Sequence, residues 1–379
     1  MDPLRRNRFG VSVVFVAHGA VTGSFATRVP WLADHVGVGT GRLGLALLFP
    51  AIGAMATMSF SGRLLHRYEG RRVTRLLLAA WCLALPLPAL APNLPLLCAA
   101  LLVYGSVSGM ADVAMNAQAV AVENRYGRPI MSGLHGLWSA GGLAASGIGV
   151  AAAAVGLDAR VHFGLMAAVL LVVGQLGGRL LPTVRPDPDA AEPPAFALPP
   201  RPVLLIGLVG FCAVFGEAAG SDWAAKYLTD VAGAGQGIAA GAYTGFACAM
   251  AAARLVGDRV VARLGVVGTV RLGGVLSAAG AVLIVLSRAP VPGIVGFALL
   301  GVGVSVVVPL TFTAAGAATS HPGHAIAGVA TISYGAGLAA PAVIGGIAAG
   351  TSLPVSFLVV AALAVLIAVG AGTFRTRRP

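Results

Sequence analysis

The sequence is short of charge. Only 10% of its 379 residues are Asp, Glu, Lys or Arg, whereas 58% are apolar. A soluble domain with this composition would aggregate, so we expect lipid to be the solvent of the folded chain. Aromatic residues are also few, at 6%, which argues against a membrane β-barrel with its girdles of aromatic side chains. These absences predict a bundle of membrane-spanning helices.

Cysteine and the motifs of catalysis are scarce as well. The four cysteines lie in apolar runs, without the paired spacing of a metal site or a disulfide, and we interpret them as packing residues. The sequence has no Gly-x4-Gly-Lys-Ser/Thr loop for ATP, no Gly-x-Ser-x-Gly nucleophile turn and no His-Glu-x2-His helix. We therefore expect no enzyme activity, no bound metal and no cofactor.

The charge that is present is mainly positive, with 25 Lys and Arg against 13 Asp and Glu. Most of the basic residues lie between apolar runs, in loops that would share one side of the membrane with both termini. The positive-inside rule places that side in the cytoplasm, so we predict a multi-pass protein of a bacterial-type inner membrane. The surplus of basic residues is then an orientation signal that also attracts anionic lipid, and we expect no nucleic-acid partner.

Twelve apolar runs approach the length of about 20 residues that a helix needs to cross a bilayer. The first follows three arginines and could imitate a signal peptide, but eleven further runs favour a retained helix. The sequence predicts an all-α membrane protein of 12 transmembrane helices. The runs lie near residues 9–32, 42–62, 73–91, 95–121, 130–156, 160–181, 203–228, 238–257, 267–287, 292–317, 324–349 and 353–373.

The chain repeats itself internally, because several landmarks recur about 196 positions later. We predict two six-helix halves, residues 1–182 and 202–379, joined by a polar cytoplasmic linker at 183–201. Six crossings in each half make the halves parallel repeats, and a solute site is expected between them near the middle of the membrane. The recurring landmarks include Gly19-x3-Gly23-Ser24 with Gly216-x3-Gly220-Ser221, and Arg63-x3-Arg67 with Arg259-x3-Arg263.

Six plus six helices, a central linker and Arg-rich loops after spans two and eight resemble the major facilitator superfamily over essentially the whole chain. The loop from Gly62 to Arg72 is similar to the family's signature between spans two and three, although His66 stands where Asp is usual. In the second half, Arg254 and Asp258 are spaced to pair on one helix face. The resemblance implies a cytoplasmic gate formed by Gly62, Arg63, Arg67, Arg71, Arg254, Asp258 and Arg263.

A narrower resemblance concerns the fourth span. There Asp112-x3-Asn116 is similar to the acidic residue and the Asn of fucose-permease-type proton symporters. This sequence, together with residues 26–30 and 221–223, resembles a group of bacterial inner-membrane permeases related to the fucose permease. Arg28 departs from the sugar symporters, which tend to have an acidic or polar residue there, and this puts fucose itself in doubt as the substrate.

Polar residues within predicted spans need a reason, since a charge at the centre of a span costs about 2.5–3.5 kcal/mol. Asp112 and Asn116 share a helix face and are suited to binding hydroxyl groups or holding a proton. The alternative for Asp112 is a structural ion pair with Arg28. Arg28 either faces the central cavity, where it pairs with Asp112 or the solute, or extends to the membrane interface.

The second half offers similar choices. Glu217 and Ser221 share a face of span seven, where Glu217 serves either a proton or solute site or hydrogen bonding between helices. Asp222 and Trp223 approach the outer end of that span, where Trp commonly anchors at the interface. His135, preferred over His18, Ser139 and its counterpart Tyr334 complete the set. The candidates are Arg28, Asp112, Asn116, His135, Ser139, Glu217, Ser221, Asp222, Trp223 and Tyr334.

These features predict a secondary transporter that works as a monomer by alternating access. We expect it to import a small polar, sugar-like solute with protons, with a proton gradient as the energy source. An exporter of drugs or amphipathic metabolites is the first alternative. Such exporters resemble one another in a Gly-Pro motif on span five, which 133–156 lacks. A membrane sensor without transport activity is a remote alternative, because the sequence has no soluble output domain.

Overall fold

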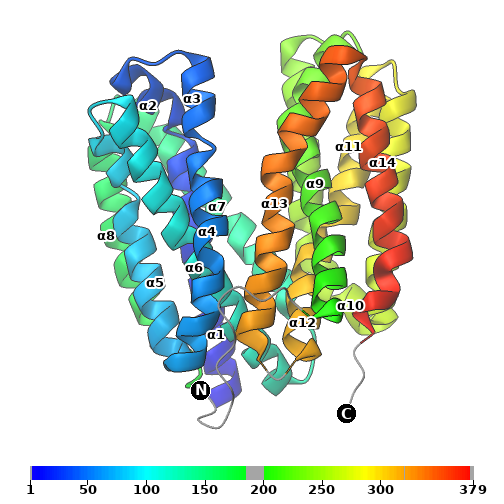
Figure 1. Cartoon of the computed structure of the whole chain (residues 1–379). Coiled ribbons are helices and arrows are strands. Elements are labelled where there is room, and N and C mark those ends of the chain that lie inside the picture. Colours follow the sequence, from blue (N-terminus) through cyan, green and yellow to red (C-terminus); the bar gives the residue numbers. More distant parts are fainter. Residues whose placement is uncertain (1, 185–199, 320, 376–379) are drawn as a thin grey trace. The chain divides into compact units, whose positions relative to one another are not determined.

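The computed structural model describes residues 2–184, 200–319 and 321–375, which fold almost entirely into helices (Figure 1). Most of the predicted linker, 185–199, lies outside the described residues. The elements in chain order are α1 (Pro3–Ala26), α2 (Val29–Val36), α3 (Thr40–Ala46), α4 (Phe49–Arg67), α5 (Gly70–Ala84), η1 (Leu87–Leu90), α6 (Leu94–Tyr126), α7 (Met131–Ala154), α8 (Ala159–Gly178), α9 (Arg201–Asp230), α10 (Gln236–Leu286), α11 (Pro290–Ser305), α12 (Val307–Ala318), α13 (Pro322–Gly350), α14 (Leu353–Gly370) and η2 (Ala371–Phe374).

Eleven helical segments in this part of the chain are long and apolar enough to cross a membrane. One of them, in α10, contains Gly265 with φ 70° and ψ 170°, a conformation outside the helical region. The chain turns at this residue, so α10 supplies both the eighth and the ninth predicted crossings. The described residues therefore contain the twelve predicted spans, and the prediction of an all-α membrane protein is confirmed.

Local sequence signals set many of the helix ends. The Asn93 side chain accepts a hydrogen bond from the Leu96 amide at 3.1 Å and caps α6, which satisfies one of the unpaired N–H groups of the first turn. Asp158 caps α8 in the same way. Gly37 and Gly127 end α2 and α6 in the left-handed conformation, which glycine adopts without steric cost.

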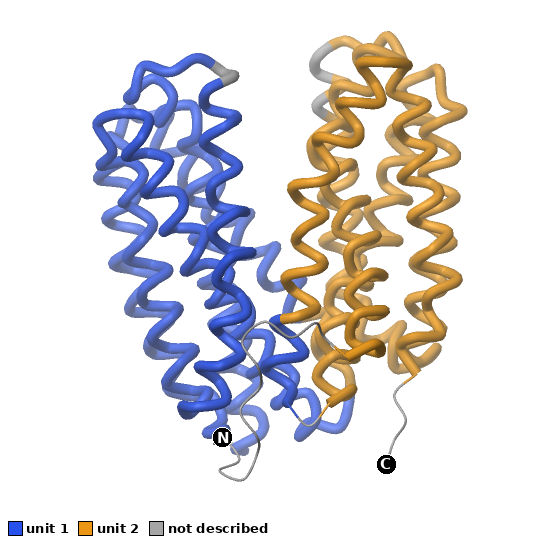
Figure 2. The backbone as a smooth tube through the Cα atoms, in the orientation of Figure 1, with its two compact units in different colours: residues 1–128, 134–197, 321–327 blue, residues 129–133, 198–320, 328–379 orange. Residues whose placement is uncertain are grey.

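The chain divides into two compact units (Figure 2). Unit 1 contains residues 1–128, 134–197 and 321–327, and unit 2 contains 129–133, 198–320 and 328–379. Each unit thus includes the start of one helix whose remainder belongs to the other unit: the start of α7 belongs to unit 2, and the start of α13 to unit 1.

Glycine permits the closest approaches between helices inside each unit. In unit 1, a Cβ atom on Gly19 of α1 would overlap the Trp138 carbonyl of α7, and one on Gly105 of α6 would overlap the backbone of Pro50 in α4. In unit 2, a Cβ atom on Gly280 of α10 would lie 2.5 Å from the Leu300 nitrogen of α11. Small residues let helix backbones approach in lipid, where apolar burial does not drive association, and this explains much of the use of 53 glycines.

Candidate functional site

The predicted pair on α6 is buried inside unit 1. Asp112 is 7% exposed and Asn116 is fully buried, one helical turn further on. Asn116 Nδ2 donates to the Asp112 carbonyl oxygen at 2.9 Å and to Asp112 Oδ1 at 3.2 Å. The Asn116 side chain is therefore held against the carboxyl group by two bonds from the same nitrogen.

His135 of α7 extends this pair across to a second helix. Its Nε2 lies 3.2 Å from Asn116 Oδ1, and its ring packs edge-on against Phe15 of α1. Because the Asn116 amide nitrogen faces Asp112, its oxygen is left to accept, so His135 Nε2 carries the proton. Ser139 Oγ donates to the His135 carbonyl at 3.1 Å. Asp112, Asn116 and His135 form what we call the carboxyl–amide–imidazole chain.

A second histidine lies on the neighbouring helix α1. Trp138 Nε1 donates to His18 Nδ1 at 3.0 Å, and the His18 ring stacks on Trp81 of α5 with 5.4 Å between ring centroids. His18 Nε2 is buried without a hydrogen-bond partner in the described residues. Sequence spacing does not point to Trp81 or to a pairing of His18 with Trp138, since both contacts depend on how α1, α5 and α7 pack.

Arg28 lies between α1 and α2 and is only 4% exposed. Its guanidinium donates to the Leu157 carbonyl in the loop after α7. Within the described residues it forms no ion pair, so its predicted pairing with Asp112 is wrong: the hydrogen bond to the Leu157 carbonyl holds the guanidinium there. A contact between Arg28 and the solute stays a prediction.

Unit 2 holds an ion pair between a buried arginine and a half-buried glutamate. Arg254 of α10 is 3% exposed, and its Nη2 lies 2.9 Å from Glu217 Oε2 of α9. Arg254 Nε also donates to the Ser305 carbonyl at the end of α11, at 3.2 Å. This partner lies on another helix, whereas the i,i+4 spacing had suggested Asp258. Glu217 is thereby shown in hydrogen bonding between helices, one of the two roles considered for it.

Asp258 serves a different group, the start of α7. Its Oδ1 accepts from the Ser132 amide and its Oδ2 from the Gly133 amide, both at 3.0 Å, and Ser132 Oγ donates to the Arg254 carbonyl at 2.8 Å. The first N–H groups of a helix lack partners within it and carry partial positive charge. A carboxylate from α10 thus caps α7, in a contact that lies entirely within unit 2.

The equivalent place in the first half is built without a carboxylate. By the repeat offset, Gly62 corresponds to Asp258, and a Cβ atom on Gly62 would lie 3.1 Å from the His324 Cα at the start of α13. Nearby, the rings of His66 and His321 have centroids 5.8 Å apart. The two halves therefore make corresponding helix contacts with unlike chemistry, a carboxylate cap in one and close glycine packing in the other.

The other candidates are more peripheral. Ser221 and Tyr334 are half-buried in unit 2, Asp222 is exposed, and Trp223 borders a cavity at the end of α9. Among the gate residues, Arg67 and Arg263 are exposed, and Arg71 pairs with Glu69 at 3.0 Å. Arg63 is half-buried and its Nε has no hydrogen-bond partner in the part of the chain that is described.

The arrangement suits binding and proton exchange within a membrane. No three His, Cys, Asp or Glu side chains of the described residues come together as a metal site requires. Instead, buried carboxyl, amide and imidazole groups lie on membrane-spanning helices. The sequence model of the Major Facilitator Superfamily matches residues 11–341 of this chain. This chain belongs to that family.

Relatives and solved structures agree with this assignment. The uncharacterized transporter y4wD of Sinorhizobium fredii is 35% identical over 365 residues, which is 95% of this chain and 96% of the relative. An uncharacterized MFS-type transporter of Yersinia pestis is 38% identical over 360 residues, covering 95% and 93%. The crystal structure of the MFS transporter FucP in the outward conformation matches with a TM-score of 0.84 at 14% identity, over 100% of this chain and 99% of that chain. The protein is thus a multi-pass membrane transporter of the MFS type.

Proposed function

We propose that this transporter takes up a small polar, sugar-like solute together with protons, by alternating access, and that Asp112 is the proton-carrying group. The observation that carries the proposal is the buried carboxyl–amide–imidazole chain near the middle of α6. Charge is costly in the middle of a membrane-spanning helix, so a carboxyl group there is suited to exchanging a proton as its access to water changes.

The contacts of Asp112 suggest how the proton and the solute are linked. When ionised, its carboxylate accepts the Asn116 amide hydrogen at 3.2 Å and can accept hydroxyl hydrogens from a solute. When protonated, it becomes a donor and loses its charge, which removes the cost of enclosing it. Proton binding thus favours a closed, loaded state, and proton release to the other side frees the solute.

Glu217 and Arg254 form an ion pair in unit 2 that is less suited to carrying the coupling proton. The two charges offset each other at 2.9 Å, so this pair can stay ionised while the protonation of Asp112 changes. Protonation of Glu217 would leave the buried Arg254 charge without this partner, which is unfavourable. We therefore assign the coupling proton to Asp112 in preference to Glu217.

The surroundings of the protein follow from the same proposal. Both termini lie on the cytoplasmic side of a bacterial inner membrane, as the distribution of basic residues indicates. The protein acts as a monomer, driven by a proton gradient without a cofactor. A solved structure of similar fold is titled a fucose:proton symporter, and its 15% identity supports the fold alone, so the sugar-like solute rests on the hydroxyl-binding chemistry of Asp112 and Asn116.

Liposomes that contain a pH-reporting dye test the proposal. Purified protein is challenged with a panel of sugars, polyols, organic acids and cationic drugs. We expect one solute class to acidify the lumen, and Asp112→Asn to reduce this signal to that of protein-free liposomes. Asp158→Asn is the matched control, because this carboxyl is an exposed cap of α8 and its loss should leave transport unchanged.

Two results would refute the proposal. Solute-driven alkalinisation of the lumen would indicate exchange and thus an exporter. Uptake of a labelled solute that proceeds equally well in wild type and Asp112→Asn, without dye response, would show that Asp112 carries no coupled proton.

A further inference from the structure

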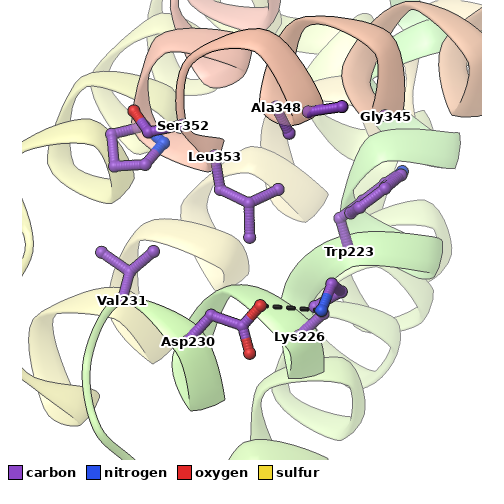
Figure 3. Close-up of a pocket in the computed structure, with 10 residues that line it drawn as sticks. Trp223, Lys226, Asp230, Val231, Gly345, Ala348, Ser352 and Leu353 are labelled. Carbon is purple, nitrogen blue, oxygen red and sulfur yellow. Dashed lines mark ion pairs between the residues drawn. The ribbon is translucent and has the colours of Figure 1, made fainter.

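A cavity of about 450 Å³ lies in unit 2, at the end of α9 and the junction of α13 with α14. Trp223, Lys226 and Asp230 line it from α9, and the other lining residues include Ser352 and Leu353. Figure 3 shows the Lys226–Asp230 pair on α9 between Trp223 on one side and Val231 on the other. This cavity is separate from the carboxyl–amide–imidazole chain, which belongs to unit 1.

One helix face supplies the chemistry of the cavity. Trp223, Lys226 and Asp230 are spaced at i, i+3 and i+7, so their side chains follow the same side of α9. Lys226 Nζ lies 2.7 Å from Asp230 Oδ2, and the two side chains are 57% and 44% exposed. An indole ring therefore lies beside a charged donor and a charged acceptor, both open to a ligand.

The wall formed by α13 is mostly apolar. Gly345, Ala348 and Ala349 of α13 line the cavity, and an added Cβ on Gly345 would lie 3.4 Å from the edge of the Trp223 ring. Gly345 thus lets the edge of the indole pack directly against α13. Ser352 adds a hydroxyl that makes no capping hydrogen bond to α14.

The charges in the cavity discriminate between ligand classes. Lys226 and Asp230 neutralise each other, and a cationic or anionic ligand would have to compete with one of them for the other. A neutral ligand can instead donate to Asp230 and accept from Lys226 while the pair stays intact, as charge-assisted hydrogen bonds favour. A ring with hydroxyls at its edge and C–H groups on its face suits both features. The hydroxyls can bond to the Lys226–Asp230 pair, and the C–H face can pack against the flat, apolar indole.

We propose that this cavity is a second binding site, for a neutral polyhydroxylated ring of the monosaccharide class. With both termini cytoplasmic, this end of α9 faces outward, so the site would receive the solute before transport. This role rests on the proposed uptake function, whereas binding to the cavity does not.

Binding is tested with purified full-length protein in detergent, by titrating tryptophan fluorescence without any gradient. The probes are D-galactose, L-fucose and D-glucose, with D-galactosamine and D-galacturonate as charged versions of one ring. We expect a saturable change with at least one neutral sugar, and its loss in Trp223→Phe, which keeps the other three tryptophans. The matched variants Lys226→Met and Asp230→Leu should each raise the half-saturating concentration by about tenfold.

Several results would overturn the inference. These are tighter binding of galactosamine or galacturonate than of galactose, a fluorescence change that survives in Trp223→Phe, and no saturable change with any neutral sugar. Both charge substitutions lie on exposed side chains, so folding is expected to persist and is checked by gel filtration. Asp112→Asn should keep the fluorescence response, so a positive titration without proton movement in liposomes would refute the transport proposal and leave this site standing.

Discussion

Replacing Asp258 with Ala tests whether a carboxylate from α10 holds the start of α7. The change removes two hydrogen bonds of 3.0 Å, to the Ser132 and Gly133 amides. Loss of a helix cap costs about 0.5–2 kcal/mol, and a hydrogen bond to a charged group contributes about 1.5–3 kcal/mol. Because Asp258 is half-buried and water can replace part of the interaction, we expect about 2 kcal/mol, or about a 30-fold shift in local opening.

Hydrogen exchange measured by mass spectrometry reports this opening directly. Peptides that contain residues 131–134 should exchange about 30-fold faster in Asp258→Ala, while the middle of α7 stays unchanged. Asp258→Asn retains one acceptor oxygen and should give a smaller increase. Arg263→Gln, an exposed change on the same helix, is the control. Unchanged exchange at 131–134 in a folded Asp258→Ala protein would contradict the assigned cap.

Two further predictions concern packing and charge. Gly105→Ala should lower the free energy of unfolding by about 3 kcal/mol or more, because its Cβ would overlap the Pro50 backbone. Gly147→Ala, with open space around it, should be neutral or stabilise by up to about 1 kcal/mol. Equal thermal unfolding midpoints in the two variants would contradict the close approach. For the ion pair, Glu217→Gln and Arg254→Gln should each destabilise, and their double-mutant cycle should show a coupling of about 1 kcal/mol or more. Additive changes in unfolding free energy would argue against the pair.

The course of the helices was largely predictable, because apolar runs, prolines and basic loops act locally. The predicted run at 203–228 corresponds to α9, Arg201–Asp230, and the run at 130–156 to α7, Met131–Ala154. The run at 42–62 is less simple, since the chain leaves the regular helix between α3 and α4 before Pro50. Hydropathy does not show such an interruption, because the residues there are as apolar as those in the helices.

The partners of the polar residues were much harder to predict. Asn116 follows Asp112 by one turn, and helix geometry alone places them together. Arg254, by contrast, is equally well spaced for Asp258, and only the packing of α9 against α10 brings Glu217 to it. Sequence spacing describes one helix face at a time, so it does not predict a contact between two helices unless the internal repeat indicates which residues correspond.

Gly265 decides more than the shape of α10. A continuous helix of its 51 residues would be about 75 Å long, more than twice the roughly 30 Å of a hydrocarbon core. A side chain at this position would favour straightening, and the chain would then lose one crossing. Every later loop would exchange its aqueous compartment for the opposite one, Arg288 and Arg375 included. The orientation of the last third of the protein thus depends on a residue that carries no charge and no side chain.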